Sequence, residues 1–217
     1  MTDYNKNFNS DAVRVAVTGS VYFSDKDYAD VKEKAEDCTI DLGADPDFTH
    51  LGILTEDALE HEFKDDTEDV GSWQASTVRT IIKSRTASVK LASLETTRQA
   101  LDLFYGTTTD NVTTKDKNTI FSVQASVARP RFVAVFEFQD GVTKSGDPIV
   151  YRIVLPVGQV SEVESPKFTS GDAISWGVTI NALSSSEGLM KVVTTDPNAQ
   201  DNPTPKAPTV ESAKWAK

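Results

Sequence analysis

The chain has 217 residues, of which 38% are hydrophobic and 25% charged, a balance typical of a folded globular chain rather than a disordered one. Its formal net charge of -11 predicts a surface that repels nucleic acid and anionic lipid. Because no apolar run approaches the roughly 20 residues of a transmembrane helix, the sequence excludes an integral helical membrane protein. The polar start of the sequence is also unlike a secretory signal.

The first third of the chain combines one predicted strand with a charged connection. Valines alternate with other residues through 13–17, which predicts a strand with one buried face. We interpret residues 25–37, which are dense in charge, as an exposed loop rather than a short helix. The single cysteine, Cys38, alternates with Ile40 and Leu42 and is expected on an apolar strand face. With no second cysteine, stability must come from packing and assembly.

An acidic segment and a basic segment follow each other in the middle of the chain. Residues 55–72 are dense in Asp and Glu without sustained alternation, which predicts a long inter-strand loop; we extend it to residue 76 as an assembly loop. Residues 78–94 are predicted to form a long strand with a bulge near 83–86, because the apolar positions change parity there. Arg79, Lys83 and Arg85 share one parity and would form a basic stripe.

The acidic loop and the basic stripe allow three interpretations. They can pair within one subunit as a local hairpin, pair between subunits as a contact that sets orientation, or remain two solvated faces. Under the second interpretation, the candidate interface residues are Glu60, Glu62, Phe63, Asp65, Asp66, Glu68, Asp69, Trp73, Arg79, Lys83 and Arg85.

One helix is predicted after these segments. Thr96 and Gln99 fit a capping box, and an apolar stripe of Leu101, Phe104 and Tyr105 follows at helical spacing. Gly106 is expected to end the helix in a left-handed conformation. This stripe is interpreted as a packing face rather than a ligand site.

Strands dominate the rest of the chain. Alternation predicts strands at 121–127 and 174–180, each with one buried face. Residues 132–138 and 149–157 are apolar on both faces, which predicts a central antiparallel hairpin. The last segment, 194–217, is rich in proline and is predicted to be a flexible tail, which leaves residues 1–193 as one β domain.

Known catalytic and metal-binding patterns are missing from the sequence. The two histidines, His50 and His61, lie outside metal-ligand spacings, and no phosphate-binding or nucleophile motif occurs. The carboxylates of residues 56–69 lie in a hydrophilic run, whereas a catalytic pair needs a buried setting that separates the two pKa values. We therefore expect a protein that is not an enzyme, with no cofactor and no metal.

The residues resemble a known family, the major tail protein, or tail tube protein, of long-tailed non-contractile phages of the siphovirus type. The resemblance covers roughly residues 12–182 and is carried by four stretches in order: AVTGSVY at 16–22, FTHLGILTEDAL at 48–59, Trp73 followed by VRT at 78–80, and LETT at 94–97 leading through Leu101 to Tyr105 and Gly106. Ala58 departs from the family pattern, which often has glycine there, and Gln74 begins a stretch that replaces a glycine-rich turn.

The resemblance implies a mostly-β fold, a β-sandwich or barrel of the tail tube type with one flanking α-helix and a long inter-strand loop. It implies hexameric rings that stack into a hollow tube through which DNA passes without specific binding. The partners it implies are further copies of the chain and the tape measure, tail tip and tail terminator proteins, with no membrane partner. The protein would be made in the cytoplasm of the bacterial host and reside in the virion.

A second interpretation from the residues is a β-sandwich binding module for a carbohydrate or a host surface. Such a module usually displays several aromatic side chains on one face. The three tryptophans, Trp73, Trp176 and Trp215, are scattered along the sequence instead, and Trp176 alternates with polar residues as a core residue would. A tube subunit is therefore the interpretation that we favour.

Overall fold

The computed structural model describes residues 9–74, 76–107, 112–125, 129–143 and 145–200. Within them, a 3-10 helix at Ser10–Ala12 precedes the helices α1 (Tyr28–Ala35), α2 (Arg98–Tyr105) and α3 (Pro197–Gln200). The strands are β1 (Thr18–Ser24), β2 (Thr49–His50), β3 (Leu54–Val70), β4 (Arg79–Ser93), β5 (Val112–Lys115), β6 (Asn118–Phe121), β7 (Phe132–Val142), β8 (Pro148–Val163), β9 (Trp176–Ala182) and β10 (Lys191–Thr194).

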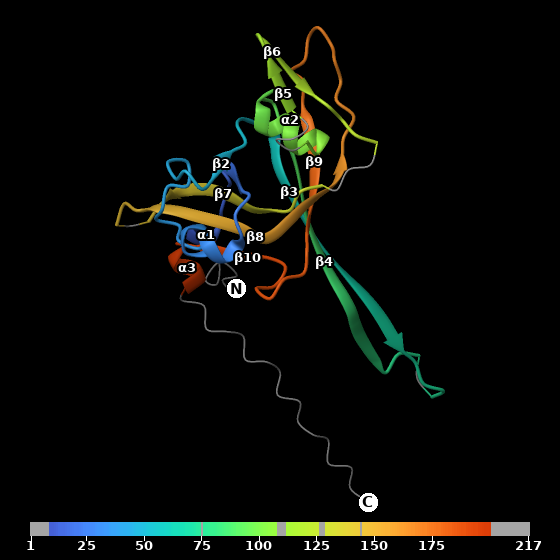
Figure 1. Cartoon of the computed structure of the whole chain (residues 1–217). Helices are drawn as coiled ribbons and strands as arrows, with labels where there is room; N and C mark the ends of the chain where they lie inside the picture. Colours follow the sequence, from blue (N-terminus) through green and yellow to red (C-terminus); the bar gives the residue numbers. More distant parts are fainter. Residues whose placement is uncertain (1–8, 75, 108–111, 126–128, 144, 201–217) are drawn as a thin grey trace, which may run out of the picture.

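Antiparallel pairing joins these strands into one large sheet with the order β2-β1-β7-β8-β9-β4-β3, and β10 also pairs with β8 (Figure 1). Strands β5 and β6 form a separate two-stranded hairpin. The predicted central hairpin is confirmed, because β7 and β8 pair from Val135↔Val154 to Gln139↔Val150. The mostly-β fold class is likewise confirmed.

The sheet is buried on both sides, because successive residues of β7 face different helices. Val133 and Val135 pack in a cluster with the α1 residue Val31, whereas Ala134 and Phe136 belong to the larger cluster beneath α2. This alternation places α1 on one face of the sheet and α2 on the other. Two helices of eight residues therefore flank the sheet, where the sequence predicted one.

Helix α2 forms close to where the capping pattern predicted it, but its N-cap is Thr97 rather than Thr96. The Thr97 hydroxyl accepts a hydrogen bond from the backbone N–H of Ala100. The neighbouring Thr96 hydroxyl instead accepts a hydrogen bond from the indole N–H of Trp176 at 3.0 Å. Gly106 ends the helix at φ 65°, as expected of a left-handed cap.

Several local predictions were wrong. Residues 25–37, predicted as a loop, contain α1, whose Tyr28, Val31 and Ala35 are buried. Cys38 lies in a turn after α1 rather than on a strand and is half-buried, and this burial raises the pKa of its thiol. The strand predicted at 121–127 is wrong, because β6 already ends at Phe121 and residues 122–125 are not in a strand. Residues 126–128 lie outside the described residues.

The strand predicted at 13–17 and the tail predicted at 194–217 were also wrong in part. Val13, Val15 and Val17 precede β1 instead of forming it, and their side chains are 62–72% exposed. The predicted tail begins too early, because Thr194 belongs to β10 and residues 197–200 form α3. The rest of that tail, 201–217, lies outside the described residues.

Candidate assembly surfaces

A long hairpin leaves the body of the molecule. Strands β3 and β4 pair from Leu59↔Leu91 out to Val70↔Arg79, and the first eight residues of β4 are exposed. We call residues 63–87 the arm; it begins at the pair Phe63↔Ala87, where Ala87 is buried. Figure 1 shows the arm projecting away from the helices and the rest of the sheet. The acidic segment predicted as a loop is therefore a regular strand.

The arm carries the bulge that its sequence predicted. Asp66 pairs with Ser84 and Thr67 pairs with Ile82, so Lys83 is the extra residue on β4. A bulge of this kind bends the strand and increases its twist. It also changes which face of the hairpin the later side chains share. Arg79 and Arg85 are six positions apart on β4, but their partners Val70 and Asp65 are five positions apart on β3, so the two arginines lie on opposite faces. The predicted single basic stripe is therefore divided between two faces.

Acidic and basic side chains pair across the arm within one chain, as the local-hairpin interpretation allowed. Arg85 holds Asp65 with two hydrogen bonds of 2.6 and 2.8 Å, which keeps the pKa of that carboxyl below its usual range. Lys83 lies 3.0 Å from Glu68. These pairs are exposed to solvent, so they fix the strand register more than they stabilise the fold.

Hydrophobic side chains are displayed on the same arm. They are Phe63, Val70, Trp73, Val78, Ile81 and Ile82, each at least 40% exposed. Trp73 is 98% exposed at the connection between the two strands, the most exposed of the large hydrophobic residues that the structure describes. Exposed apolar groups gathered on one projection are typical of a surface that contacts another molecule.

Residues of β3 near the body of the molecule line an acidic recess of about 260 Å³. Glu60 and Glu62 share it with Glu162 and Glu164 of β8 and its continuation, and with Lys90, whose ammonium lies 2.7 Å from Glu164. The remaining predicted interface residues, Asp66 and Asp69, also lie on β3; Asp69 accepts a hydrogen bond from Thr80.

The two histidines lie apart from any metal-ligand group. His50 lies in β2 against the ring of Tyr22, and His61 packs edge-on against Phe63 at 4.5 Å. The buried Nε2 of His61 has no hydrogen-bond partner. Within the described ranges, His, Cys, Asp and Glu form no group of three or more that could hold a metal ion.

Both borders of the large sheet are open. Strand β3 has β4 as its only partner among the described strands, which leaves its outer backbone groups unpaired by a strand. At the other border, β2 covers only Tyr22 and Phe23 of β1. Open borders of this length invite pairing with another chain.

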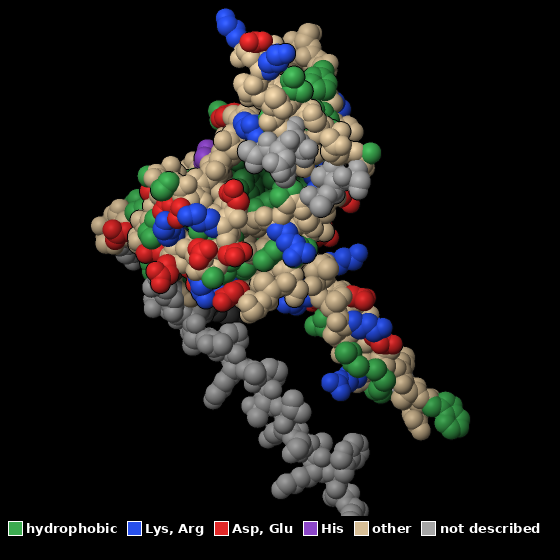
Figure 2. All heavy atoms as spheres, viewed as in Figure 1, with side chains coloured by type: hydrophobic (Ala, Val, Ile, Leu, Met, Phe, Trp, Pro, Cys, Tyr) green, Lys and Arg blue, Asp and Glu red, His purple; other side chains and the backbone are tan. Residues whose placement is uncertain are grey.

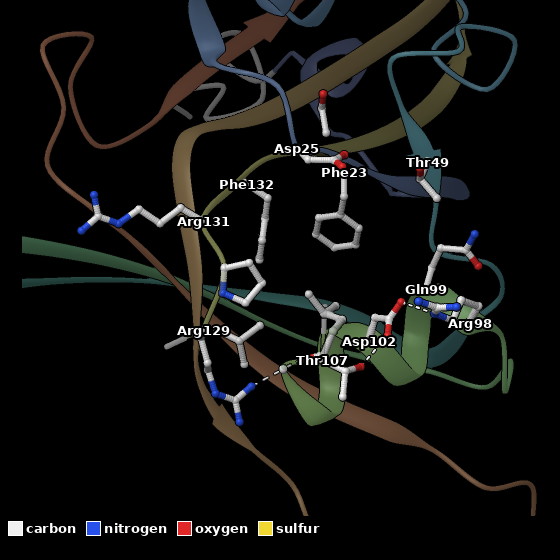
Figure 3. Close-up of a pocket in the computed structure, with 15 residues that line it drawn as sticks. Phe23, Asp25, Thr49, Arg98, Gln99, Asp102, Thr107, Arg129, Arg131 and Phe132 are labelled. Carbon is white, nitrogen blue, oxygen red and sulfur yellow. Dashed lines mark hydrogen bonds and ion pairs between the residues drawn. The ribbon is translucent and has the colours of Figure 1, made fainter. Parts of the chain in front are cut away.

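A pocket of about 450 Å³ lies where α2 faces β1 and β7 (Figure 3). Phe23 and Phe132 meet edge-to-face with 5.1 Å between their ring centroids, and Leu103 of α2 also lines the pocket. The sequence did not predict this pocket, because Leu103 and Phe132 lie about 80 and 110 residues after Phe23 in the chain. No local sequence pattern indicates that such distant segments meet.

Three arginines surround the pocket: Arg98, Arg129 and Arg131. Arg98 is paired with Asp102 one helical turn later, and Arg129 reaches the carbonyl oxygens at the end of α2 at 3.4 and 3.5 Å. Arg131 points outward and has no side-chain hydrogen bond or ion pair within the described part of the chain (Figure 3).

The described helices have at most eight residues, too short for any of them to cross a lipid bilayer. Of the two other tryptophans, Trp176 is 5% exposed in the core beneath α2, as predicted, and Trp215 lies outside the described residues.

Comparison with known proteins gives one family and several distant structures. The model of the family described as phage tail tube protein matches residues 6–207. No curated protein matches the chain.

Three solved structures illustrate the distant likeness. The tail of an empty gene transfer agent particle, with C6 symmetry, is 14% identical over 70% of this chain and 90% of that one, with a TM-score of 0.38. The tube-terminating cap of the anti-feeding prophage is 9% identical over 89% and 99%, with a TM-score of 0.48. The sheath-tube complex of PVC, an extracellular contractile injection system in the extended state, is 7% identical over 84% and 91%, with a TM-score of 0.42.

Proposed function

This chain belongs to the phage tail tube protein family, and we propose that it works by closing into rings of six copies that stack into the hollow tube through which phage DNA passes. The family match extends over every strand that the structure describes. The protein is thus a structural subunit of the phage tail. The proposal concerns how its surfaces build the tube.

The open sheet borders support a ring. The border at β3 and the border at β1 are different surfaces of one chain, so joining one to the other is a head-to-tail contact. Contacts of this type close into a ring when their rotation allows it and otherwise continue as a filament. A ring closed in this way leaves no sheet border exposed, which removes an aggregation hazard of the isolated subunit.

The arm is the observation that carries the proposal. It is twenty-five residues long, from Phe63 to Ala87, and Figure 1 shows its outer part projecting away from the helices and the rest of the sheet. A projection with exposed apolar side chains can bury them against a neighbouring subunit. We assign the candidate interface residues of β3 and β4 to this contact, which either joins neighbouring copies in a ring or joins successive rings.

Charge supports the passage of DNA. The subunit has 33 acidic and 22 basic residues, and the resulting net charge of -11 repels phosphates. Because nonspecific affinity for DNA comes from lysines and arginines that neutralise phosphates, an acidic bore would let DNA slide. We infer a passive conduit with no catalytic activity, whose subunit is made in the bacterial cytoplasm and whose partners in the virion are the tape measure, tail tip and tail terminator proteins.

Electron microscopy of an arm-shortened variant tests the proposal. Replacing residues 65–85 with an Asn-Gly turn joins the paired Lys64 and Thr86 directly and leaves the buried base intact. We expect the variant to unfold at the temperature of the natural protein, but to form no tubes at concentrations where the natural protein does. Tubes of ordinary diameter from the variant would refute the role of the arm, and a natural protein that stays monomeric at high concentration would refute the tube itself.

A further inference from the structure

We propose that the arm tip of one copy inserts Trp73 into the pocket between α2 and the sheet of a neighbouring copy. This inference rests on the proposed function, because it assumes that copies of the chain associate. It goes further by naming both halves of the contact: an aromatic knob on the arm, and an arginine-rimmed apolar pocket on the body.

Trp73 has the properties of an interface anchor. Its side chain is 98% exposed, although an indole ring is among the side chains that gain most from burial. It lies between Val70 and Val78, which are themselves 41% and 57% exposed, so the apolar surface continues on both sides of it. Buried tryptophans are strongly enriched among the few residues that dominate the affinity of protein interfaces.

The pocket has the size and lining to accept such a ring. Its volume of about 450 Å³ lies within the range of about 300–1,000 Å³ that is usual for pockets that bind small molecules. Phe23 and Phe132 supply aromatic edges, and Leu103 and Val160 supply aliphatic contacts. Aromatic rings favour edge-to-face or offset contacts with one another, which this lining provides.

Charge allows the arm to occupy the pocket. The arm, residues 63–87, is neutral, because its four carboxylates are matched by four basic side chains: Asp65, Asp66, Glu68 and Asp69 against Lys64, Arg79, Lys83 and Arg85. The pocket has three arginines against two aspartates, Asp25 and Asp102, and Asp102 is already paired with Arg98. Arg131 points outward and has no partner among the described residues, so it can pair with one carboxylate of the incoming arm.

The contact must join two molecules. The arm leaves the sheet on the side away from α2, and Figure 1 shows its tip and α2 at opposite ends of the structure. Figure 2 shows an apolar hollow on the body near α2, well separated from the arm. A knob and a pocket at different places on the same chain form a head-to-tail contact, which propagates from copy to copy.

Site-specific photo-cross-linking tests this contact directly. A benzophenone amino acid replaces Trp73 in the full chain, and assembled tubes are irradiated and analysed by peptide mass spectrometry. We expect cross-links to peptides that contain residues 98–107 or 129–132. Cross-links confined to other peptides, in tubes confirmed by microscopy, would overturn the pocket assignment while leaving the tube function intact. Failure of the natural protein to form tubes would overturn both.

Substitutions give a second readout. Trp73→Ala should raise the protein concentration needed for tube formation about 10-fold or more, whereas Trp73→Phe keeps an aromatic knob and should raise it much less. Leu103→Arg places a charge inside the pocket and should act like Trp73→Ala, provided that its thermal unfolding confirms a folded monomer. Equal assembly by Trp73→Ala and the natural protein would refute the proposal.

Discussion

The guanidinium group of Arg152 donates a hydrogen bond to the carboxylate of Glu137 on the neighbouring strand, with 2.6 Å between Nε and Oε2. Arg152 is 1% exposed, and its other nitrogens donate to the carbonyl oxygens of Lys34, Asp37 and Ile40 around the end of α1. One buried cation therefore connects the central sheet with α1 and the turn that follows it.

Replacing this cation should destabilise the protein strongly. In Arg152→Met, Glu137 loses its buried partner and three carbonyl oxygens lose a donor, so we expect the free energy of unfolding to fall by about 3–5 kcal/mol. Urea denaturation followed by circular dichroism measures the change. Lys83→Met, which breaks an exposed ion pair on the arm, is the control and should leave stability nearly unchanged. Equal effects of the two substitutions would contradict this account.

Acid should weaken the attachment of the C-terminal segment. Arg14 contacts Asp196 with two hydrogen bonds of 2.7 and 2.8 Å and holds the pKa of that buried carboxyl well below its usual range, with help from Tyr151. A carboxyl whose pKa is lower in the folded state stabilises the fold above its unfolded pKa of about 4 and loses this effect as the pH falls. Asp196→Asn should therefore be less stable than the natural protein at pH 7.

The pH dependence distinguishes this ion pair from simple packing. The difference in unfolding free energy between the natural protein and Asp196→Asn should stay constant from pH 7 to about 5 and shrink steadily below about 4. Denaturation curves recorded across this range measure it. A difference that is the same at pH 3 and pH 7 would show that charge is not the cause.

The adjacent residues Thr96 and Thr97 have different roles: Thr97 caps α2, and Thr96 accepts a hydrogen bond from Trp176. Thr97→Ala removes the acceptor for the Ala100 N–H and should cost about 1 kcal/mol of unfolding free energy, whereas Thr97→Ser keeps the cap and should cost much less. Thr96→Ala should instead alter the fluorescence of Trp176, because it removes the partner of the indole N–H. A shift of Trp176 fluorescence in Thr97→Ala alone would contradict this division.

The bulge at Lys83 should matter for assembly more than for folding. Deleting Lys83 restores a regular ladder between β3 and β4, which removes the local bend and redirects the arm tip. We expect a folded monomer with impaired tube formation, measured by circular dichroism and negative-stain microscopy. Lys83→Ala retains the extra residue and should assemble better than the deletion variant. Normal tubes from the deletion variant would show that the bend has no role.

The sequence predicted the elements whose residues reveal their own environment. Strands β7 and β8 are apolar on both faces, a pattern that a central hairpin explains well. The change of parity among the apolar residues of β4 predicted the bulge, and Gly106 predicted where α2 ends. In each case the signal was local: an alternation, a break in it, or a residue suited to one backbone conformation.

The misses have a common physical cause. Strand β3 contains eight carboxylates, which have low strand propensity, and it forms because β4 supplies an antiparallel partner with opposite charges. Helix α1 buries Tyr28, Val31 and Ala35 at helical spacing, but charged residues between them obscure the pattern. The valines of 13–17 alternate as a strand would, but their side chains are exposed, because alternation alone does not determine whether a face is covered by other residues.

The candidate site was predicted in the same uneven way. The sequence grouped residues of β3 and β4 with Trp73 as candidates for an interface, which stays a prediction, and it did not predict that the acidic ones lie on a strand. The arginine-rimmed pocket stayed hidden, because Phe23, Leu103 and Phe132 come together only through the fold.

The attachment near the two chain ends has a practical consequence. Asn9 and Asn198 share a hydrogen bond of 3.1 Å, and the side chain of Asn198 also donates to the backbone of Asp11. Residues at opposite ends of the described chain are therefore direct neighbours. A circular permutant that links these positions and opens at the exposed connection between β7 and β8 would preserve the strand pairings, offering a route to subunits with relocated termini.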